Sequence, residues 1–375
     1  MHIDRRTMLA GTAAALAAAP ALAQRRATAP AWYDRAIIID ALGGTGDPYD
    51  ASGTATRMGD RSWHETVATG VTVVRDTVMP VGNVANPWAD YQTALAAKQA
   101  LLAAKPDRLI LVRTAADILK AKREKKFGVV IGTQDTAMVG GDLERLVQMK
   151  KDGVMSFQLT YNNANLSGDG ALEPRNSGLT KLGRATIERI EAEKVLLDLS
   201  HGGARTMAEA AAHAKRPLVI SHTGARALID HPRNTADETI RAVADKGGVT
   251  GVYFMPFLRL GAPATMADVL DHIDHVARVA GEDHVGIGTD NGVLPLGLDE
   301  AAKKRQDDYT RQRIKTGIAS PGEAPGIYPW VEELNHVNRY REVAAALTRR
   351  GWSEARLEKL FGGNFLRVYQ EAWGG

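Results

Sequence analysis

The chain alternates between short apolar runs and longer stretches in which apolar residues recur with helical spacing. The apolar runs are rich in Val, Ile and Leu and cover residues 36–40, 71–77, 108–112, 128–132, 155–160, 195–200, 217–221, 249–254 and 285–289. Continuous apolar runs of this length are typical of strands that are covered on both faces, as in parallel sheets. Helical spacing occurs between most of them, for example over 141–151, 179–193 and 266–280. The alternation predicts an α/β fold.

These nine runs predict an eight-stranded (β/α)8 barrel, a TIM barrel, with one peripheral strand that we assign to 108–112. No internal repeat or change in composition divides residues 24–375, and barrels of this type often form a single domain of this length. The segment 299–329 is charged, rich in Gly and Pro near its end, and without a clear apolar period. It predicts a loop insertion over the carboxyl-terminal face of the barrel.

The first 23 residues have the pattern of an export signal. Arg5 and Arg6 precede an Ala-rich apolar stretch that ends at the small-residue site 21–23, after which we expect cleavage. The adjacent arginines resemble a twin-arginine signal. A membrane anchor is the alternative, but the stretch is shorter than the ~18–20 residues that span a bilayer. We therefore expect a periplasmic protein without a stable membrane anchor after cleavage.

Composition narrows the classes of partner and of metal site. The 47 Lys and Arg residues nearly balance the 44 Asp and Glu residues, and no basic stripe with interleaved aromatic residues occurs, so we expect no nucleic-acid partner. The absence of cysteine excludes a thiol nucleophile, an Fe–S cluster, a thiolate zinc site and disulfides. A small-molecule substrate is the expected partner, and the sequence leaves open whether the protein forms a homo-oligomer.

Polar residues follow three predicted strands. His201 follows 195–200, His222 follows 217–221 and Asp290 follows 285–289, and a serine precedes each histidine. The carboxyl ends of the strands carry the active site in parallel barrels. Imidazoles from neighbouring strands can bind one metal ion, and a carboxylate can orient a water and accept its proton. Six other histidines lie on predicted helices, loops or strand starts, and we expect them to be structural: His64, His213, His231, His272, His275 and His284.

Several motifs, in this order and spacing, resemble the membrane (renal) dipeptidases, zinc peptidases with an amidohydrolase-type barrel. The motifs are FQLTYNNANLSGDG, which resembles the bacterial branch, then DLSHGG, VISHTGARAL, HPRNTAD, GIGTDNG and RRGWSEARLEKLFGGNFLRVYQ. They extend over most of the chain that follows the export signal. The resemblance implies a zinc hydrolase that cleaves a dipeptide or a related small amide.

The resemblance also implies site residues. It implies that His201 and His222 bind the metal, and that Asp290 contributes to the metal site and acts as the catalytic base. It implies that Arg233 binds the carboxylate of the substrate, as a bidentate guanidinium can. A surface ion pair is the alternative role for Arg233.

Two further residues are expected at the same rim. Tyr161 replaces a histidine that assists the scissile carbonyl in the animal enzymes, and a phenol can donate a hydrogen bond to an oxyanion. Asn162 follows it and is expected either to bind substrate or to cap a turn.

The chain departs from the family at three ligand positions. Leu42 and Gly44 stand where the first strand carries a His-x-Asp pair, and Gln134 replaces a glutamate that bridges two metals. Only Asp290 survives among the carboxylates, and two zinc ions would then leave a large uncompensated charge. We expect one zinc ion, with Gln134 or Asp290 beside the two histidines. A nearby carboxylate, from Asp40, Asp47 or Asp135, could replace a lost ligand, although none is in register.

Two functions remain open from the sequence. The first is a dipeptidase-like hydrolase that uses one zinc ion and a zinc-activated water. The second is a repurposed barrel, either a non-hydrolytic enzyme of secondary metabolism or a pseudoenzyme. The lost ligands favour the second function, and the retention of His201, His222, Arg233 and Asp290 favours the first, which we prefer.

Overall fold

The fold is described by a computed structural model that covers residues 31–50, 58–296 and 299–374. The expected export signal, residues 1–23, lies outside the described residues. The strands are β1 (Ile39–Gly44), β2 (Val73–Thr77), β3 (Leu109–Leu111), β4 (Phe127–Thr133), β5 (Val154–Gln158), β6 (Leu196–Asp198), β7 (Val219–Thr223), β8 (Val249–Val252), β9 (Val285–Ile287) and β10 (Asn291–Gly292).

The strands form a closed parallel barrel. Their order along the sheet is β10-β1-β2-β4-β5-β6-β7-β8-β9, and the pairs between neighbours are parallel. Only residues 288–290 separate β9 from β10, so the two ends of this path belong to one interrupted strand, and the backbone N–H of Asp290 donates to the carbonyl of Leu42 (2.8 Å). The predicted eight-stranded barrel is therefore confirmed. Strand β3 pairs with β4 outside the ring, as predicted for 108–112.

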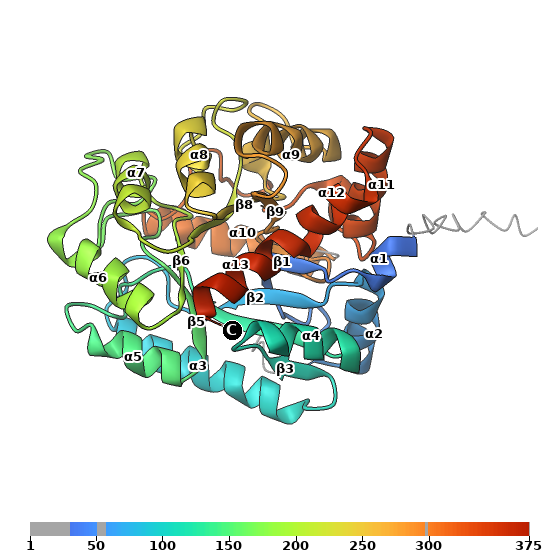
Figure 1. Ribbon diagram of the computed structural model, residues 1–375, viewed down its shortest axis with the longest axis horizontal. Coiled ribbons are helices and arrows are strands. Elements are labelled where there is room, and N and C mark those ends of the chain that lie inside the picture. Colours follow the sequence, from blue (N-terminus) through green and yellow to red (C-terminus); the bar gives the residue numbers. More distant parts are fainter. Residues whose placement is uncertain (1–30, 51–57, 297–298, 375) are drawn as a thin grey trace, which may run out of the picture.

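Helices surround the barrel (Figure 1). They are α1 (Ala31–Arg35), α2 (Asp60–Thr69), α3 (Pro87–Ala104), α4 (Ala115–Glu124), α5 (Glu144–Lys151), α6 (Lys181–Ala192), α7 (Ala204–His213), α8 (Asp237–Asp245), α9 (Met266–Ala280), α10 (Glu300–Lys315), α11 (Arg339–Arg349), α12 (Glu354–Glu358) and α13 (Asn364–Trp373). Short 3₁₀ helices cover Pro256–Leu258 and Glu332–Leu334, and a π-helical segment covers Lys359–Gly363. The described part of the chain contains no helix that is long and apolar enough to cross a membrane.

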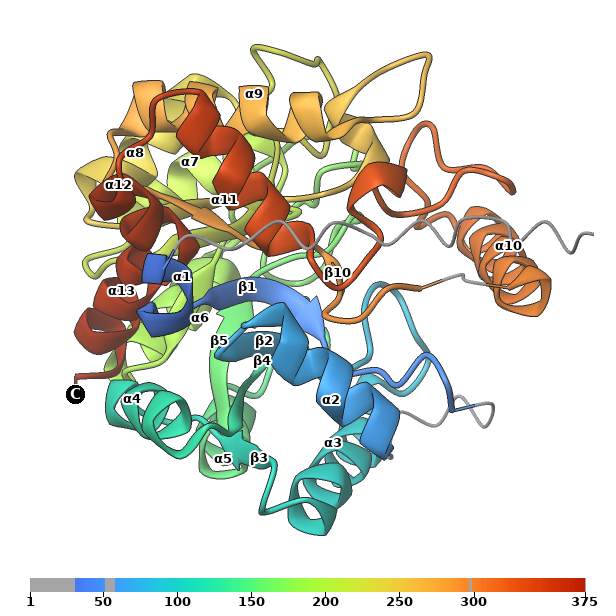
Figure 2. The ribbon, with the colours of Figure 1, turned by 90° about the vertical axis from the view of Figure 1, so that its right-hand side faces the viewer.

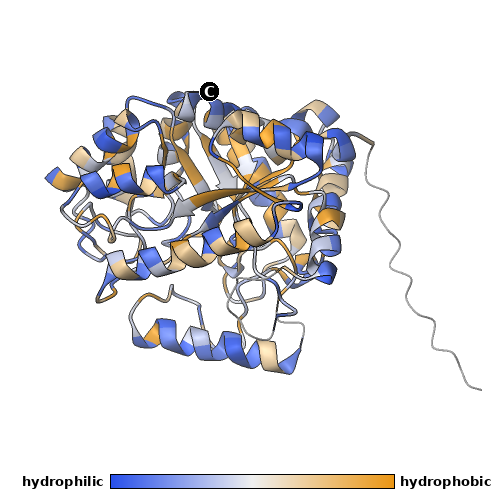
Figure 3. Cartoon of the chain, turned by 90° about the horizontal axis from the view of Figure 1, so that it is seen from below, coloured by the Kyte–Doolittle hydropathy of each residue, from blue (hydrophilic) through white to orange (hydrophobic). Residues whose placement is uncertain are grey.

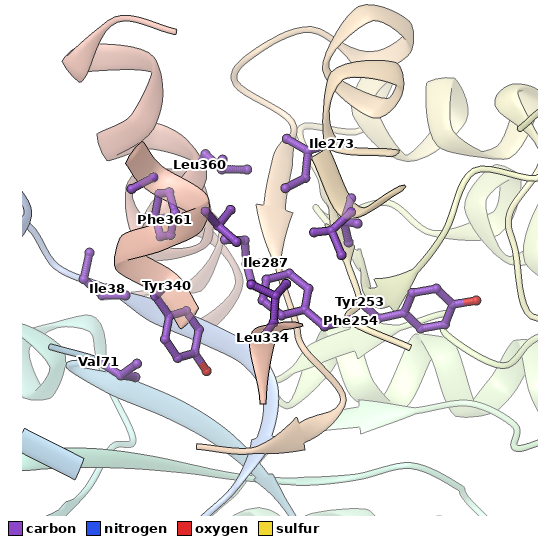
Figure 4. Close-up of a cluster of buried hydrophobic side chains, with 14 of the residues drawn as sticks. Ile38, Val71, Tyr253, Phe254, Ile273, Ile287, Leu334, Tyr340, Leu360 and Phe361 are labelled. Carbon is purple, nitrogen blue, oxygen red and sulfur yellow. The ribbon is translucent and has the colours of Figure 1, made fainter. Parts of the chain in front are cut away.

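The apolar runs form strands because both of their faces are covered. Every residue of β4 and β5 is buried, as a strand between the barrel interior and the outer helices requires. On one side of the barrel, Ile287 of β9 packs in one cluster with Ile273 of α9, Tyr340 of α11 and Phe361 of the π-helical segment (Figure 4). This packing fixes the helices that follow the last strand onto the barrel wall.

Helix α10 corrects one expectation from the sequence. The segment 299–329 was predicted as an irregular loop, but its first half is a helix of 16 residues, which begins after the Asp299 side chain caps the backbone N–H of Ala302 (2.7 Å). Only Thr310 and Arg313 are buried in it. Figure 3 shows this helix as mostly hydrophilic, and Figure 2 shows it beside the end of the barrel toward which β1 points. Few buried apolar residues explain why no apolar period marks the helix.

Candidate active site

A cavity of about 220 Å³ lies at the carboxyl ends of the barrel strands. Five of the residues expected at the site line it, from four strand ends and one loop: Gln134, Tyr161, His201, Arg233 and Asp290. His222 lies in β7 beside them, with its ring centroid 5.0 Å from that of His201. The fold therefore brings residues from distant parts of the sequence to one rim, as a parallel barrel does.

Two of the cavity residues have an unusual backbone conformation. His201 and Asp290 have φ values of 62° and 58°, in the left-handed region that a non-glycine residue rarely adopts. Such a conformation costs about 1–3 kcal/mol, and it persists where the surrounding structure holds it. At both positions it turns the chain sharply at the end of a strand, so that the side chain faces the cavity.

The hydrogen bonds of His201 fix its tautomer. Its Nδ1 lies 2.6 Å from Oδ1 of Asn162, an atom that can only accept, so Nδ1 carries the proton. Its Nε2 therefore has a free lone pair, and this buried atom has no hydrogen-bond partner. Asn162 is held in turn because its Nδ2 donates to the carbonyl of Ile318 (2.6 Å).

A chain of hydrogen bonds beneath the cavity fixes the tautomer of His222. The hydroxyl of Ser221 donates to Oδ2 of Asp198 (2.5 Å), so it accepts from Nδ1 of His222 (2.8 Å). The proton is again on Nδ1 and the lone pair on Nε2. The guanidinium of Arg75, buried inside the barrel 3.8 Å from Asp198, balances the charge of that carboxylate.

Burial sets the charge states of the cavity. It lowers the pKa of His201 and of His222 well below the usual range, and the positive charge of Arg233 lowers both further. Both imidazoles are therefore neutral, as a metal ligand must be. Burial raises the pKa of Asp290 to about 6, against the opposing effect of Arg233 and Arg313. Asp290 is thus close to the range in which a carboxylate can exchange a proton at neutral pH.

Arg233 is buried rather than paired on the surface. It is 3% exposed, lines the cavity, and its Nη2 has no hydrogen-bond partner. Asp230 pairs instead with Arg226 (2.7 Å) and Asp237 with His275 (2.8 Å). The alternative role of Arg233 in a surface ion pair is wrong, and an unpaired guanidinium N–H is available for an anionic group in the cavity.

Tyr161 is held between a ring and a cation. Its ring stacks on His201 with the centroids 4.1 Å apart, and its hydroxyl accepts from Nη1 of Arg313 (3.1 Å). Arg313 also donates from Nε and Nη2 to the two carboxylate oxygens of Glu323 (2.7 and 3.0 Å). Because the hydroxyl of Tyr161 accepts from Arg313, its own proton is free to be donated into the cavity.

Two expected residues have other orientations. Both polar ends of Asn162 are bound to His201 and Ile318 and the residue does not line the cavity, so its expected substrate contact is replaced by a role in holding His201. Gln134 turns Nε2, not Oε1, toward Nε2 of His222 (3.4 Å), while its Oε1 accepts from the hydroxyl of Thr77 (3.0 Å). In this orientation Gln134 does not offer its oxygen as a metal ligand.

The carboxylates that could replace the lost ligands are used elsewhere. Asp40 accepts from Thr289 and Tyr340 (both 2.6 Å), Asp47 accepts from the backbone N–H of Gly59, and Asp135 accepts from the backbone of 82 and 137 and from an asparagine. Over the described ranges no three His, Asp or Glu side chains are close enough together to hold a metal ion. Among the described residues at this site, the Nε2 lone pairs of His201 and His222 are donors of the type that binds zinc.

Sequence reasoning missed Arg313, Glu323 and Asp198. Arg313 and Glu323 line the cavity from the segment that was predicted as a loop, and no local pattern marked them. Asp198 lies within the DLSHGG motif, and the repeated Ser-His pair was the available signal for a shared support beneath the histidines.

The comparison with known protein families agrees with the family that the order and spacing of the motifs indicate. The family described as membrane dipeptidase (Peptidase family M19) matches residues 88–306 and 317–373. The chain belongs to the membrane dipeptidase family. Members of this family are metal-dependent peptidases, and both the fold and the family expected from the sequence are confirmed.

Three comparisons show the degree of similarity to individual proteins. A protein in the pqqA 5′ region of Klebsiella pneumoniae is 30% identical over 74% of this chain and 94% of its own length. A dipeptidase of Claviceps purpurea is 27% identical over 71% of this chain but only 56% of its own length. The solved structure of an amidohydrolase from Pseudomonas aeruginosa has 28% identity and a TM-score of 0.78, covering 92% of this chain and 98% of that chain.

Proposed function

We propose that this membrane dipeptidase homologue hydrolyses a dipeptide or a related small amide that carries a free carboxylate, with one zinc ion. One observation carries the proposal: Nε2 of His201 and Nη2 of Arg233 are buried without a hydrogen-bond partner, and both residues line the same cavity of about 220 Å³. The first suits a metal ion and the second suits a carboxylate. A cavity that offers both can hold an amide between them.

The metal would be held by Nε2 of His201 and of His222, with Asp290 as the remaining carboxylate of the rim. When bound, zinc polarises a carbonyl and lowers the pKa of a bound water. The two histidines suit this task because both are neutral and both carry the proton on Nδ1.

The residues of the chain divide the remaining work. Arg233 binds the carboxylate of the substrate and fixes its orientation. Asp290, whose pKa is about 6, accepts the proton of the attacking water and returns it to the leaving amine. The hydroxyl of Tyr161, oriented by Arg313, donates to the carbonyl oxygen as negative charge develops on it.

A non-hydrolytic barrel is the less supported function. The altered positions 42, 44 and 134 favour it, whereas the family match and the similarity to a Claviceps purpurea protein named as a dipeptidase favour hydrolysis. The presence of two neutral histidines, His201 and His222, beside Arg233, which has an unpartnered guanidinium nitrogen, also favours hydrolysis.

Elemental analysis and an activity assay test the proposal. Protein purified without added metal should contain at most one zinc per chain, and the metal should be lost in His201→Ala and His222→Ala but retained in Leu42→Ala. Arg233→Met should keep its zinc. Its binding free energy for dipeptides should weaken by up to about 2–5 kcal/mol, the cost of removing a buried charged contact. Two zinc ions per chain would refute the single-zinc site. Unchanged dipeptide affinity in Arg233→Met would refute the role of Arg233 in binding the substrate carboxylate.

We also propose that the protein is exported to the periplasm through the twin-arginine route, on the basis of Arg5, Arg6 and the apolar stretch after them. Fractionation of cells that express the full chain and an Arg5→Lys, Arg6→Lys variant tests this. Periplasmic recovery of the natural protein alone supports the route, and equal recovery of both contradicts it.

A further inference from the structure

A second and larger cavity adjoins the candidate active site. Its volume is about 600 Å³, compared with about 220 Å³ for the catalytic cavity, and Pro256, Phe257 and Ile327 line both. The second cavity lies between the segment 256–264, which precedes α9, and the segment 321–332, which follows α10. A cavity of this size is within the range that small-molecule ligands occupy.

The charged and imidazole groups that line the second cavity are engaged by the protein itself. Arg259 binds both carboxylate oxygens of Asp268 (2.9 Å each), and Glu332 accepts from the indole N–H of Trp330 (3.0 Å). Nε2 of His231 bonds to a backbone carbonyl (2.9 Å). Because each of these groups already has a partner, they give no reason to expect a charged ligand in the second cavity.

The rest of the wall is apolar and partly aromatic. The rings of Tyr328 and Trp330 stack in parallel with their centroids 4.8 Å apart. Leu260 and Ile327 are 58% and 46% exposed, which is a large exposure for side chains that line a cavity. Such a surface gains free energy when an apolar group covers it.

The apolar cavity is built on the same turn as Arg233. The backbone N–H of Arg233 donates to Nδ1 of His231 (3.1 Å), and the ring of His231 stacks on Phe257 with a centroid distance of 4.6 Å. Phe257 is part of the common wall of the two cavities. Arg233 lines the catalytic cavity, so a ligand whose carboxylate it binds lies in the cavity that shares Phe257 with the apolar cavity.

We infer that the second cavity binds a large apolar group of the substrate, so that the preferred substrate is an amide with a free carboxylate and one bulky aliphatic or aromatic group. The inference rests on the proposed function for the role of Arg233. It extends the proposed substrate class toward larger amides, because the apolar cavity adds its volume to that of the catalytic cavity.

Binding of two carboxylates that contain no amide bond tests the inference without hydrolysis. Butanoate and 4-(2-naphthyl)butanoate share the carboxylate and differ in the aromatic group. In calorimetric titrations of the full chain, the naphthyl compound should bind at least about tenfold more tightly, as burial of an aromatic group predicts. Equal affinity for the two compounds would overturn the inference.

Matched variants locate the effect. Ala262 lines the second cavity and is exposed, so Ala262→Trp should fill the cavity and remove the advantage of the naphthyl compound, whereas Ala116→Trp, on an exposed face of α4, should keep it. Leu260→Gln should reduce the advantage without disturbing the fold, because Leu260 is largely exposed. An advantage that survives both Ala262→Trp and Leu260→Gln would overturn the inference.

Two further results distinguish this inference from two other outcomes, namely failure of the proposed hydrolase function and binding of a protein partner at this surface. If no amide is hydrolysed while the naphthyl preference is present and sensitive to Ala262→Trp, the cavity assignment stands and the hydrolase proposal fails. A dimer in sedimentation velocity that Leu260→Gln dissociates would assign the surface to a second copy of the chain and overturn the inference.

Discussion

At the level of single residues, the side chains at positions 42, 44 and 134 determine how much positive charge the site can hold. Leucine, glycine and glutamine contribute no negative charge. Of the two carboxylates that line the cavity among the described residues, Glu323 is paired with Arg313, which leaves Asp290 beside the histidine pair. The nearby carboxylates Asp40 and Asp135 are bound by structural donors. This charge count supports the proposal of a single zinc ion.

Restoring the family pattern should raise the zinc content. The variant Leu42→His, Gly44→Asp, Gln134→Glu should bind close to two zinc ions and cleave dipeptides faster than the natural protein, because the added carboxylates balance a second ion. A Cβ at Gly44 meets no atom closer than 3.9 Å, so the aspartate has space. The gain should be partial, since new ligands lack supporting hydrogen bonds. Elemental analysis and dipeptide kinetics measure both effects.

The matched control places the new carboxylate outside the ligand register. Gly46→Asp, combined with Leu42→His and Gln134→Glu, adds the same charge where a Cβ meets nothing within 4 Å. An equal zinc content in the two triple variants would show that charge alone, and not ligand position, limits metal binding.

At the level of elements, a buried ion pair ties helix α3 to the barrel. Lys98 of α3 donates to Asp76 of β2 and to the hydroxyl of Thr45 (2.8 Å), just after β1. The hydroxyl of Thr45 donates to the same carboxylate (2.5 Å), and its backbone N–H also donates to it (3.0 Å). One carboxylate therefore joins a helix to the ends of two neighbouring strands.

Lys98→Met should destabilise the protein by about 3–5 kcal/mol, because it leaves the buried Asp76 without its cation. Addition of Asp76→Asn should restore part of the loss, since the uncompensated charge is then removed. The free energy of unfolding in urea measures both effects. The exposed Lys120 of α4 provides the control, and a loss in Lys98→Met no larger than in Lys120→Met would contradict the prediction.

The elements that could be predicted from the sequence are those with a strong apolar pattern. Strands β1 to β9 follow from continuous apolar runs, and α9 matches its predicted range, 266–280, because Thr265 and Asp268 form a capping box at its start. Strand β1 extends to Gly44, beyond the predicted end at Asp40, because its last part pairs with β2 and β10 through the backbone rather than through an apolar run. Helix α10 has too few buried residues to leave a pattern.

The candidate site was predictable to a similar degree. Strand ends and motifs were enough to select His201, His222 and Asp290, since their positions follow from the barrel. The orientations of Asn162 and Gln134 depend on hydrogen bonds to Ile318 and Thr77, which are distant in sequence and known only from the fold.

At the level of the whole molecule, metal binding is linked to unfolding because the proposed ligands come from separate strands that assemble only in the closed barrel. Free zinc at 100 times its dissociation constant should stabilise the folded protein by about 2.7 kcal/mol. The thermal midpoint should rise by several degrees in the natural protein and stay unchanged in the His201→Ala, His222→Ala double variant. Differential scanning calorimetry at fixed zinc activity measures this, and an equal rise in both proteins would exclude these ligands.

The closure of the barrel has a consequence for the history of such sites. Strand β1 is held by backbone pairing to β2 and β10, and the registers at 43 and 44 do not depend on which side chain stands at the rim. A lineage can therefore lose or regain a ligand at this strand by single substitutions while the scaffold stays folded. If the site holds one zinc ion as proposed, related proteins with one or two ions can share the same strand pairing.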